Sequence, residues 1–145
     1  MTTDAFMAQA IAEARAGLAE GGIPIGSVLV RDGAVVARGH NRRVQEANPM
    51  KHAEIDCLIN AGRIGSYRDT TLYSTLMPCY LCAGAVVQFG IPRVIVGESR
   101  TFPGAESFLR EHGVEVVNLD LQECVQLMTE FIERSPRLWN EDIGV

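Results

Sequence analysis

The chain has 145 residues, 47% of them hydrophobic, and carries a net charge of −5 at pH 7. This length predicts one domain, residues 1–145, around a single core, and no run approaches the roughly 20 apolar residues that would span a bilayer. Binding to nucleic acid draws most of its affinity from clustered Lys and Arg, so the acidic balance and the single lysine, Lys51, argue against that class of partner.

An amphipathic helix followed by a β-hairpin is predicted for the N-terminal part. Apolar residues recur with helical spacing over residues 4–19, and Gly21-Gly22 ends the pattern. Two apolar runs, residues 26–31 and 34–38, then flank Asp32-Gly33, the dipeptide that favours a two-residue type I′ turn. The hairpin therefore supplies the first two strands.

The middle of the chain is predicted to contain a loop, two helices and one strand. Residues 40–50 are polar and indicate the loop, and a helix is expected over residues 52–62. Residues 71–76 are rich in β-branched and aromatic side chains, which predicts a strand. Pro78 suits the first position of the second helix, which is expected to continue to about residue 89.

The C-terminal half continues the alternation of strands and helices. We expect strands at 93–97 and 114–118, a helix at 105–112, and a last helix that Asp120 caps and that runs to about Arg134. Strands that alternate with helices after an initial hairpin imply one mixed central sheet of about five strands with helices on both faces. The predicted fold class is therefore α/β, as a three-layer α/β/α sandwich.

Three residues in two motifs have side chains that bind zinc. His52 belongs to His52-Ala53-Glu54, and the two cysteines belong to Pro78-Cys79-Tyr80-Leu81-Cys82. One His and two Cys fill three corners of a tetrahedral Zn²⁺ and leave the fourth for water or hydroxide, which is the open arrangement of a catalytic site. We therefore expect one Zn²⁺ per chain, held by His52, Cys79 and Cys82. The H-x-E … P-C-x-x-C pattern is the signature of zinc deaminases.

Glu54 is the predicted catalytic residue. A carboxylate close to a zinc-binding His can take a proton from the bound water and pass it to a substrate. Residues i and i+2 lie about 200° apart around a helix, so His52 and Glu54 can cooperate only if the site lies off the helix end. Without the zinc ligands, Glu54 would be read as a first-turn residue that merely favours the helix dipole.

Each motif alone allows another interpretation. A C-x-x-C can be a redox pair, and a His at a helix start can simply be a cap. A structural zinc site would need a fourth protein ligand, for which the candidates are Cys57, Cys124, His40 and His112. Cys57 lies about 140° around the helix from His52, and Cys124 belongs to an apolar stripe. Both cysteines are therefore expected to be buried in the core.

The chain resembles the cytidine deaminase superfamily and, within it, the fungal-type cytosine deaminases, along nearly its whole length. Besides the two zinc motifs, the segments that carry the likeness are residues 21–26, 38–41, 69–73, 90–93 and 96–98, and Trp139 with residues 141–144. The zinc motifs identify only the superfamily. The C-terminal tail is more discriminating.

The resemblance implies further site residues and a homodimer. Asn41 would hydrogen-bond the ring edge of a pyrimidine, and Asp142 would accept from the exocyclic amine that leaves. Phe102 and Trp139 would stack on the base, with Ile25 on the opposite side. Read without the resemblance, these residues are a loop Asn, an exposed acidic residue and aromatics of a core or interface.

The activity implied by the resemblance is zinc-dependent hydrolytic deamination of a free nucleobase, with cytosine converted to uracil and ammonia. Two residues depart from the family pattern: Met77 stands where the family has Ser, and Asn140 where it has Phe. Either change could alter the preferred ring, so isocytosine, creatinine and guanine are alternative substrates. A nucleic-acid editing deaminase and a non-catalytic zinc-binding protein are the remaining alternatives.

The cysteines and the N-terminal sequence bear on the cellular compartment of the protein. Two of the four cysteines form the C-x-x-C, which favours metal binding in a reducing compartment over a disulfide framework. The N-terminus also lacks a basic region followed by a continuous apolar block, the mark of a secretory signal. We therefore expect a cytoplasmic protein that acts on a small neutral molecule, with neither a membrane nor a nucleic acid as partner.

Overall fold

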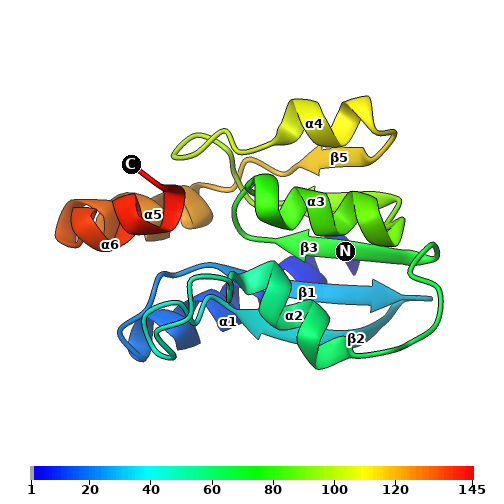
Figure 1. Ribbon diagram of the computed structural model, residues 1–145, viewed down its shortest axis with the longest axis horizontal. Coiled ribbons are helices and arrows are strands. Elements are labelled where there is room, and N and C mark those ends of the chain that lie inside the picture. The colour runs from blue at the N-terminus through cyan, green and yellow to red at the C-terminus, as the bar shows by residue number, and fades with distance from the viewer. Residues whose placement is uncertain (1) are drawn as a thin grey trace.

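A five-stranded mixed sheet forms the centre of the computed structural model, which describes residues 2–145, with side chains from Ala5 onward (Figure 1). The strands are β1 Gly26–Arg31, β2 Ala34–His40, β3 Thr70–Ser74, β4 Arg93–Val96 and β5 Glu115–Asn118. The helices are α1 Thr2–Ala19, α2 Ala53–Ala61, α3 Tyr80–Phe89, α4 Glu106–Glu111, α5 Gln122–Arg134 and α6 Pro136–Ile143.

The order of the strands is β2-β1-β3-β4-β5. Strand β1 is antiparallel to both β2 and β3, whereas β3, β4 and β5 are parallel to one another. Parallel neighbours require crossover connections, which α3 and α4 provide. The prediction of a mixed sheet in an α/β fold is thus confirmed.

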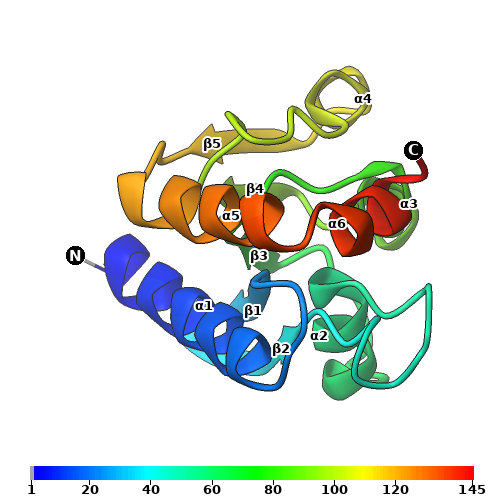
Figure 2. The same cartoon turned by 90° about the vertical axis from the view of Figure 1, so that its left-hand side faces the viewer.

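The helices form one layer on each face of the sheet, as Figures 1 and 2 show. One core cluster joins α1 and α5 to the sheet through residues that include Met7, Ile11, Val28, Ile95 and Leu127. The other joins α2, α3 and α4 to the opposite face through residues that include Leu29, Leu58, Val86, Val94 and Leu109. A third, smaller cluster packs α6 and the end of α5 beside one edge of these layers, and includes Ile23, Leu76, Phe131 and Trp139.

The β1–β2 hairpin turns as its dipeptide predicts. Asp32 and Gly33 both have positive φ, 52° and 72°, which a type I′ turn requires at its two central residues. Within β2, Gly39 lets helix α2 approach closely, because a Cβ at this position would collide with the backbone nitrogen of Cys57. The hairpin therefore fixes the depth at which α2 lies on the sheet.

Two local predictions were wrong, and one helix was not predicted at all. Helix α6, over residues 136–143, was not foreseen. Pro78 precedes the N-cap of α3, which is Cys79, and does not occupy the first helical position. Asp120 does not cap α5, because Leu121 is the N-cap and the Asp120 carboxylate instead binds the Arg100 guanidinium at 2.7 and 2.8 Å. Within the described part of the chain, none of the helices has the length and apolar character needed to cross a membrane.

Candidate metal centre and cavity

The three predicted metal ligands meet where the N-termini of α2 and α3 face each other. His52 is the N-cap of α2, with φ −67° and ψ 163°, and Cys79 is the N-cap of α3, with φ −74° and ψ −179°. Both residues are extended and neither side chain caps its own helix. The site therefore lies off the helix ends, which is the arrangement that the spacing of His52 and Glu54 demands.

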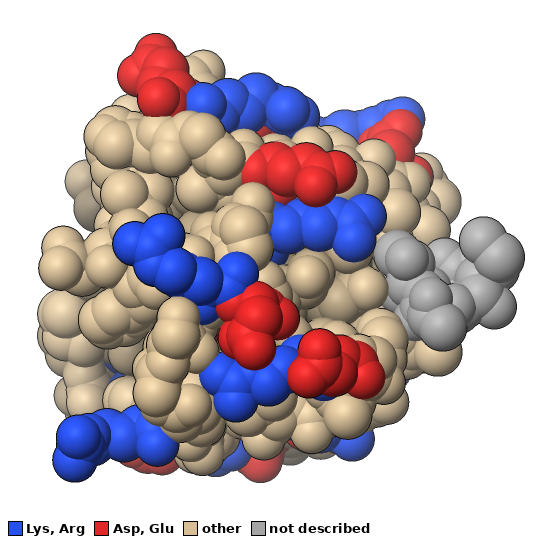
Figure 3. Space-filling model, turned by 90° about the vertical axis from the view of Figure 1, so that its right-hand side faces the viewer, with Lys and Arg blue, Asp and Glu red and all other residues tan. Residues whose placement is uncertain are grey.

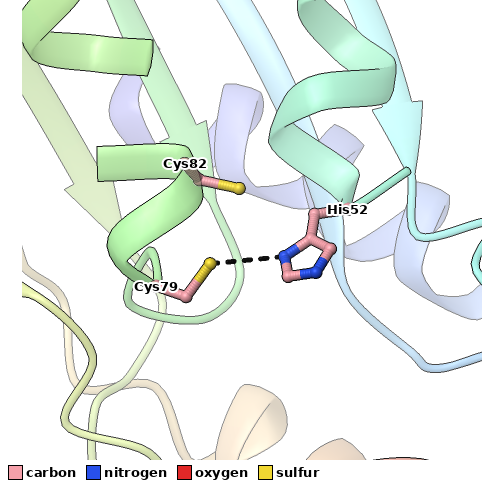
Figure 4. A group of neighbouring side chains, drawn as sticks. All are labelled: His52, Cys79 and Cys82. Atoms are coloured by element: carbon pink, nitrogen blue, oxygen red, sulfur yellow. Dashed lines mark hydrogen bonds between the residues drawn. The ribbon is translucent and has the colours of Figure 1, made fainter. Parts of the chain in front are cut away.

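The ligand atoms are close enough to hold one small cation. Nδ1 of His52 lies 3.3 Å from Sγ of Cys79, and the ligand atoms of His52, Cys79 and Cys82 all lie within 4.8 Å of one another (Figure 4). Zn–N bonds of about 2.0 Å and Zn–S bonds of about 2.3 Å in a tetrahedron put neighbouring ligand atoms roughly 3.5 Å apart. The donor set and its spacing fit Zn²⁺.

The electrostatics of the two cysteines favour one thiolate. Hydrogen bonding from Cys82 lowers the pKa of Cys79 to about 4 against the opposing effect of burial, and His52 contributes in the same direction. Donation to Cys79 and burial raise the pKa of Cys82 well above its ordinary value. Burial lowers the pKa of His52, but the hydrogen bond with Cys79 and the charge of Asp142 outweigh it and raise the pKa to about 9. A zinc ion requires both sulfurs as thiolates, and the lowered pKa of Cys79 favours the thiolate at one of the two.

Glu54 lies beside these ligands and is nearly inaccessible, with 4% of its surface exposed. Burial, and then the charge of Cys79, raise the pKa of Glu54 to about 7. The Ser74 hydroxyl, at the end of β3, lies 3.3 Å from Oε2 of Glu54 and donates to the Leu76 carbonyl at 2.7 Å. A carboxyl group with this pKa can both accept and release a proton near neutral pH.

One small cavity brings most of the predicted site residues together. It is lined by Ile25, His52, Glu54, Leu76, Met77, Cys79, Phe102, Trp139, Asp142 and Ile143. Phe102 and Trp139 meet edge to face, with ring centroids 5.6 Å apart. The volume is about 20 Å³, which is room for about one water molecule. The cavity is therefore closed over the metal ligands by the loop that carries Phe102 and by α6.

Two polar atoms near the cavity have no hydrogen-bond partner. Asn41 is fully buried, its backbone N–H donates to Ile25 and its Oδ1 accepts from Arg43, but its Nδ2 is unpaired. Asp142 Oδ1 is also unpaired, although His52 Nε2 lies 3.4 Å away. Burial raises the pKa of Asp142, and His52, Arg43 and Asn41 oppose that shift. The Asn41 amide is thus close enough to Asp142 to lower its pKa, yet neither Nδ2 nor Oδ1 has a well-formed hydrogen bond, and such a pair of buried groups is typical of a site for a polar ligand.

Several residues of the site were not predicted. Leu76 and Ile143 line the cavity, and Ser74 contacts Glu54. A polar residue inside the apolar strand that leads to the Pro-Cys motif was the available signal for Ser74. Of the two departures from the family pattern, Met77 is a wall of the cavity, whereas Asn140 is exposed and does not line it.

The other cysteines and histidines lie outside the metal centre. Cys57 and Cys124 are 0% and 1% exposed and belong to the two main core clusters, as predicted. Among the residues that the structure describes, His52, Cys79 and Cys82 are the one group of three or more His, Cys, Asp or Glu residues arranged to hold a metal. No fourth protein ligand therefore closes the site in the described part of the chain.

Residues 1–98 match the family model of the cytidine and deoxycytidylate deaminase zinc-binding region. A cytosine deaminase of Candida albicans is 48% identical over 138 residues, which cover 93% of this chain and 92% of that protein. A tRNA-specific adenosine deaminase of Bacillus subtilis is 37% identical over 144 residues, which cover 90% and 89% of the two chains.

Solved structures give a consistent comparison. A structure from a study of tRNA:A34 deaminases superposes with a TM-score of 0.76 at 30% identity and covers 86% of this chain and 99% of that one. A guanine deaminase from Nitrosomonas europaea superposes with a TM-score of 0.71 at 22% identity, over 88% and 82% of the two chains. The second likeness concerns the fold alone.

Proposed function

The chain belongs to the cytidine and deoxycytidylate deaminase family and is a zinc-dependent hydrolytic deaminase; from this premise we propose that its substrate is a free nucleobase, cytosine, which it converts to uracil and ammonia. The observation that carries the proposal is the small cavity lined by Glu54, by the metal ligands His52 and Cys79, and by Asp142, whose Oδ1 has no hydrogen-bond partner. The identity with a cytosine deaminase over nearly the full length of both chains supports the choice of base.

We propose that His52, Cys79 and Cys82 hold the metal. When bound, Zn²⁺ lowers the pKa of a water molecule and so supplies a nucleophile near neutral pH. Glu54 is the group that moves protons. Its carboxylate accepts a proton from the attacking water and delivers it to the ring nitrogen beside the reacting carbon. It then takes the second proton from the hydroxyl now bonded to that carbon and passes it to the amine, so that the C–N bond breaks and cytosine and water give uracil and ammonia.

The unpaired atoms would orient the base. Asp142 Oδ1 accepts from the exocyclic amine, and Asn41 Nδ2 donates to an acceptor on the ring edge, so both buried atoms gain the partners they lack. Phe102 and Trp139 supply aromatic walls and Ile25 an apolar one. Trp139 and Ile143, both on α6, help to exclude bulk water, which strengthens these polar contacts.

The cavity has room for about one water molecule, so a substrate can enter only after α6 and the loop of Phe102 move apart, and a free base requires less opening than a nucleic acid. The cavity is closed by α6, and a polynucleotide would need an open channel beside it. On the face shown in Figure 3, which points away from the metal centre, the described Lys and Arg side chains alternate with Asp and Glu and form no continuous basic stripe, and the whole sequence has a net charge of −5. Backbone binding depends on such a stripe. The resemblance to tRNA-acting deaminases nevertheless makes tRNA a necessary arm of the test.

Ammonia release by the zinc-loaded protein tests the substrate. The panel is cytosine, isocytosine, creatinine, guanine, cytidine and an adenosine-containing tRNA anticodon stem, compared by kcat/KM. We expect cytosine to have the highest value. A higher value for the tRNA stem, or for another ring, would reject the proposed substrate and retain the family assignment.

Glu54→Gln tests the proton transfer. Because the amide cannot accept a proton, kcat should fall by roughly 10²- to 10⁴-fold while the zinc content stays at one per chain. The matched control is Glu106→Gln, which removes a surface carboxylate paired with Arg110 and should leave kcat unchanged. Undiminished turnover in zinc-loaded Glu54→Gln would rule out the proton-transfer role.

We propose that the chain forms a homodimer through the outer faces of α2 and α3. A groove of about 750 Å³ lies there, with a largely apolar lining that includes Ile55, Ile59, Tyr67 and Phe89. Ile59 and Phe89 are 56% and 49% exposed. Contiguous exposed apolar side chains are uncommon on monomeric proteins and often mark an interface. Light scattering should report twice the chain mass, and Ile59→Glu with Phe89→Glu should give the monomer. A monomeric wild type would contradict the proposal.

Residues 1–145 are proposed to act as one cytoplasmic domain. The continuous sheet supports a single unit, and the absence of any pairing among the four cysteines supports a reducing compartment.

A further inference from the structure

The segment of residues 41–51 joins two parts of the site. It begins at Asn41, the proposed reader of the ring edge, and its end adjoins His52, the metal ligand. The segment contains neither helix nor strand, yet a backbone hydrogen bond of 2.9 Å from Arg42 to Lys51 brings its ends together. Its two ends must hold their positions if substrate and metal are to meet.

Asp56 binds both ends of this segment. The residue lies one turn after His52 on α2 and is 1% exposed. Its Oδ2 accepts from the His40 backbone N–H at 3.1 Å and from Arg42 Nε at 2.9 Å, directly on either side of Asn41. Its Oδ1 lies 3.3 Å from Nζ of Lys51, the residue before His52. One buried carboxylate thus contacts the neighbours of both functional residues.

We infer that Asp56 is a positioning residue, which holds Asn41 for substrate binding and His52 for metal binding through Arg42, Lys51 and the His40 amide. Asp56 is not among the residues that line the cavity, nor among the three metal ligands. A buried carboxylate with two cationic partners resists displacement, because separating them leaves uncompensated charge in the interior. The inference concerning Asn41 rests on the proposed function, whereas the inference concerning His52 rests only on the metal site.

The test is Asp56→Asn, which keeps the size of the side chain and removes its charge. We expect the dissociation constant for Zn²⁺, measured by competition with a chromogenic chelator, to weaken on the order of tenfold, as is common for groups that orient metal ligands. At saturating zinc, KM for cytosine should rise by a similar factor, with a smaller change in kcat. Hydrogen exchange should accelerate over residues 40–52 and not in β4.

Two further variants each remove one cationic partner of Asp56, at one end of the segment. Arg42→Met releases the Asn41 end and should mainly raise KM, whereas Lys51→Met releases the His52 end and should mainly weaken zinc binding. The stability control is Val116→Ala, in β5, a buried residue outside the site. This variant should lower Tm without changing KM or zinc affinity.

The outcomes are distinguishable. Zinc affinity and KM within twofold of wild type in Asp56→Asn, or changes no larger than those of Val116→Ala at a matched loss of Tm, would overturn the inference. If Arg42→Met and Lys51→Met changed KM and zinc affinity in the same proportion, Arg42 could not act on Asn41 alone, nor Lys51 on His52 alone, and this part of the inference would be overturned. If cytosine is not a substrate, the zinc and hydrogen-exchange measurements still decide the role of Asp56.

Discussion

At the scale of single residues, Met77 has two roles that compete. It is a wall of the cavity, and with 1% of its surface exposed it also belongs to the core cluster beneath α2, α3 and α4. Gly104, in the loop before α4, leaves room for it, because a Cβ there would come within 2.7 Å of Met77 Cγ. A smaller residue at position 77 would enlarge the cavity at the expense of packing.

Met77→Ala should lower the free energy of unfolding by about 2–5 kcal/mol, the usual cost of emptying a buried Met site. Urea denaturation with zinc held constant measures the change. Met50→Ala, at a position that is 54% exposed, is the control and should change the free energy by less than about 0.5 kcal/mol. Equal effects of the two variants would show that the core does not depend on Met77.

The residues of the site differed in how far the sequence could predict them. His52, Cys79 and Cys82 were recognisable because short spacing within two motifs places them at helix starts. Ile25, Phe102, Trp139, Asn41 and Asp142 were assigned by family resemblance alone, and their roles stay predictions. Leu76 and Ile143 carry no local pattern, and the single signal for Ser74 was its polarity within an apolar strand. Their places in the site depend on the pairing of β3 with β1 and on the packing of α6.

At the scale of elements, the position of α2 depends on a close contact with β2. Gly39 faces the backbone of Cys57, so the helix lies nearer to the strand than any side chain would permit. The same helix begins at His52 and carries Glu54 in its first turn. Its distance from the sheet therefore controls the metal centre.

Gly39→Ala should displace α2 and lower both stability and zinc affinity, with a loss of about 1–3 kcal/mol in the free energy of unfolding from overpacking. Thermal denaturation and zinc titration measure the two effects. Gly84→Ala, inside α3, is the matched control, since no atom lies within 4 Å of the added Cβ. It should stabilise the helix by roughly 0.5–1 kcal/mol. A neutral Gly39→Ala would disprove the close-contact argument.

Helix α6 shows why some elements could not be predicted. It has eight residues, fewer than an isolated helix needs in water, and Trp139 is the one hydrophobic residue that it buries. Its stability comes from contact with α5 and with the cluster around Ile25 and Phe131. The longer elements were predictable because their apolar pattern repeats over several turns or over a whole strand.

At the scale of the molecule, the metal centre connects the two halves of the sheet. His52 follows the hairpin side of the fold, and Cys79 and Cys82 follow β3, which begins the parallel side. The overall α/β/α architecture was predictable from the alternation of strands and helices. That the N-termini of α2 and α3 meet was predictable only because His52, Cys79 and Cys82 are all ligands that bind zinc.

Removal of zinc should therefore destabilise the whole molecule. At a hundredfold excess over its dissociation constant, a ligand of the native state contributes about 2.7 kcal/mol, which corresponds to a Tm difference of roughly 5–10 °C for a chain of this size. Differential scanning calorimetry before and after chelation, with zinc added back, measures the difference. The Cys79→Ser, Cys82→Ser variant should show no response to the chelator. An unchanged Tm in the wild type would mean that zinc has no structural role.

The opposed N-termini of α2 and α3 also bear on the order of folding. An ion between His52 and Cys79 joins positions 27 residues apart, and closing a loop of that length in a disordered chain costs roughly 3–4 kcal/mol of entropy. Most of that entropy is already lost when β1 pairs with β3, because the pairing brings the starts of α2 and α3 to the same edge of the sheet. We therefore expect the chain to bind its metal after the sheet has formed, so that the ion stabilises a structure that is already assembled.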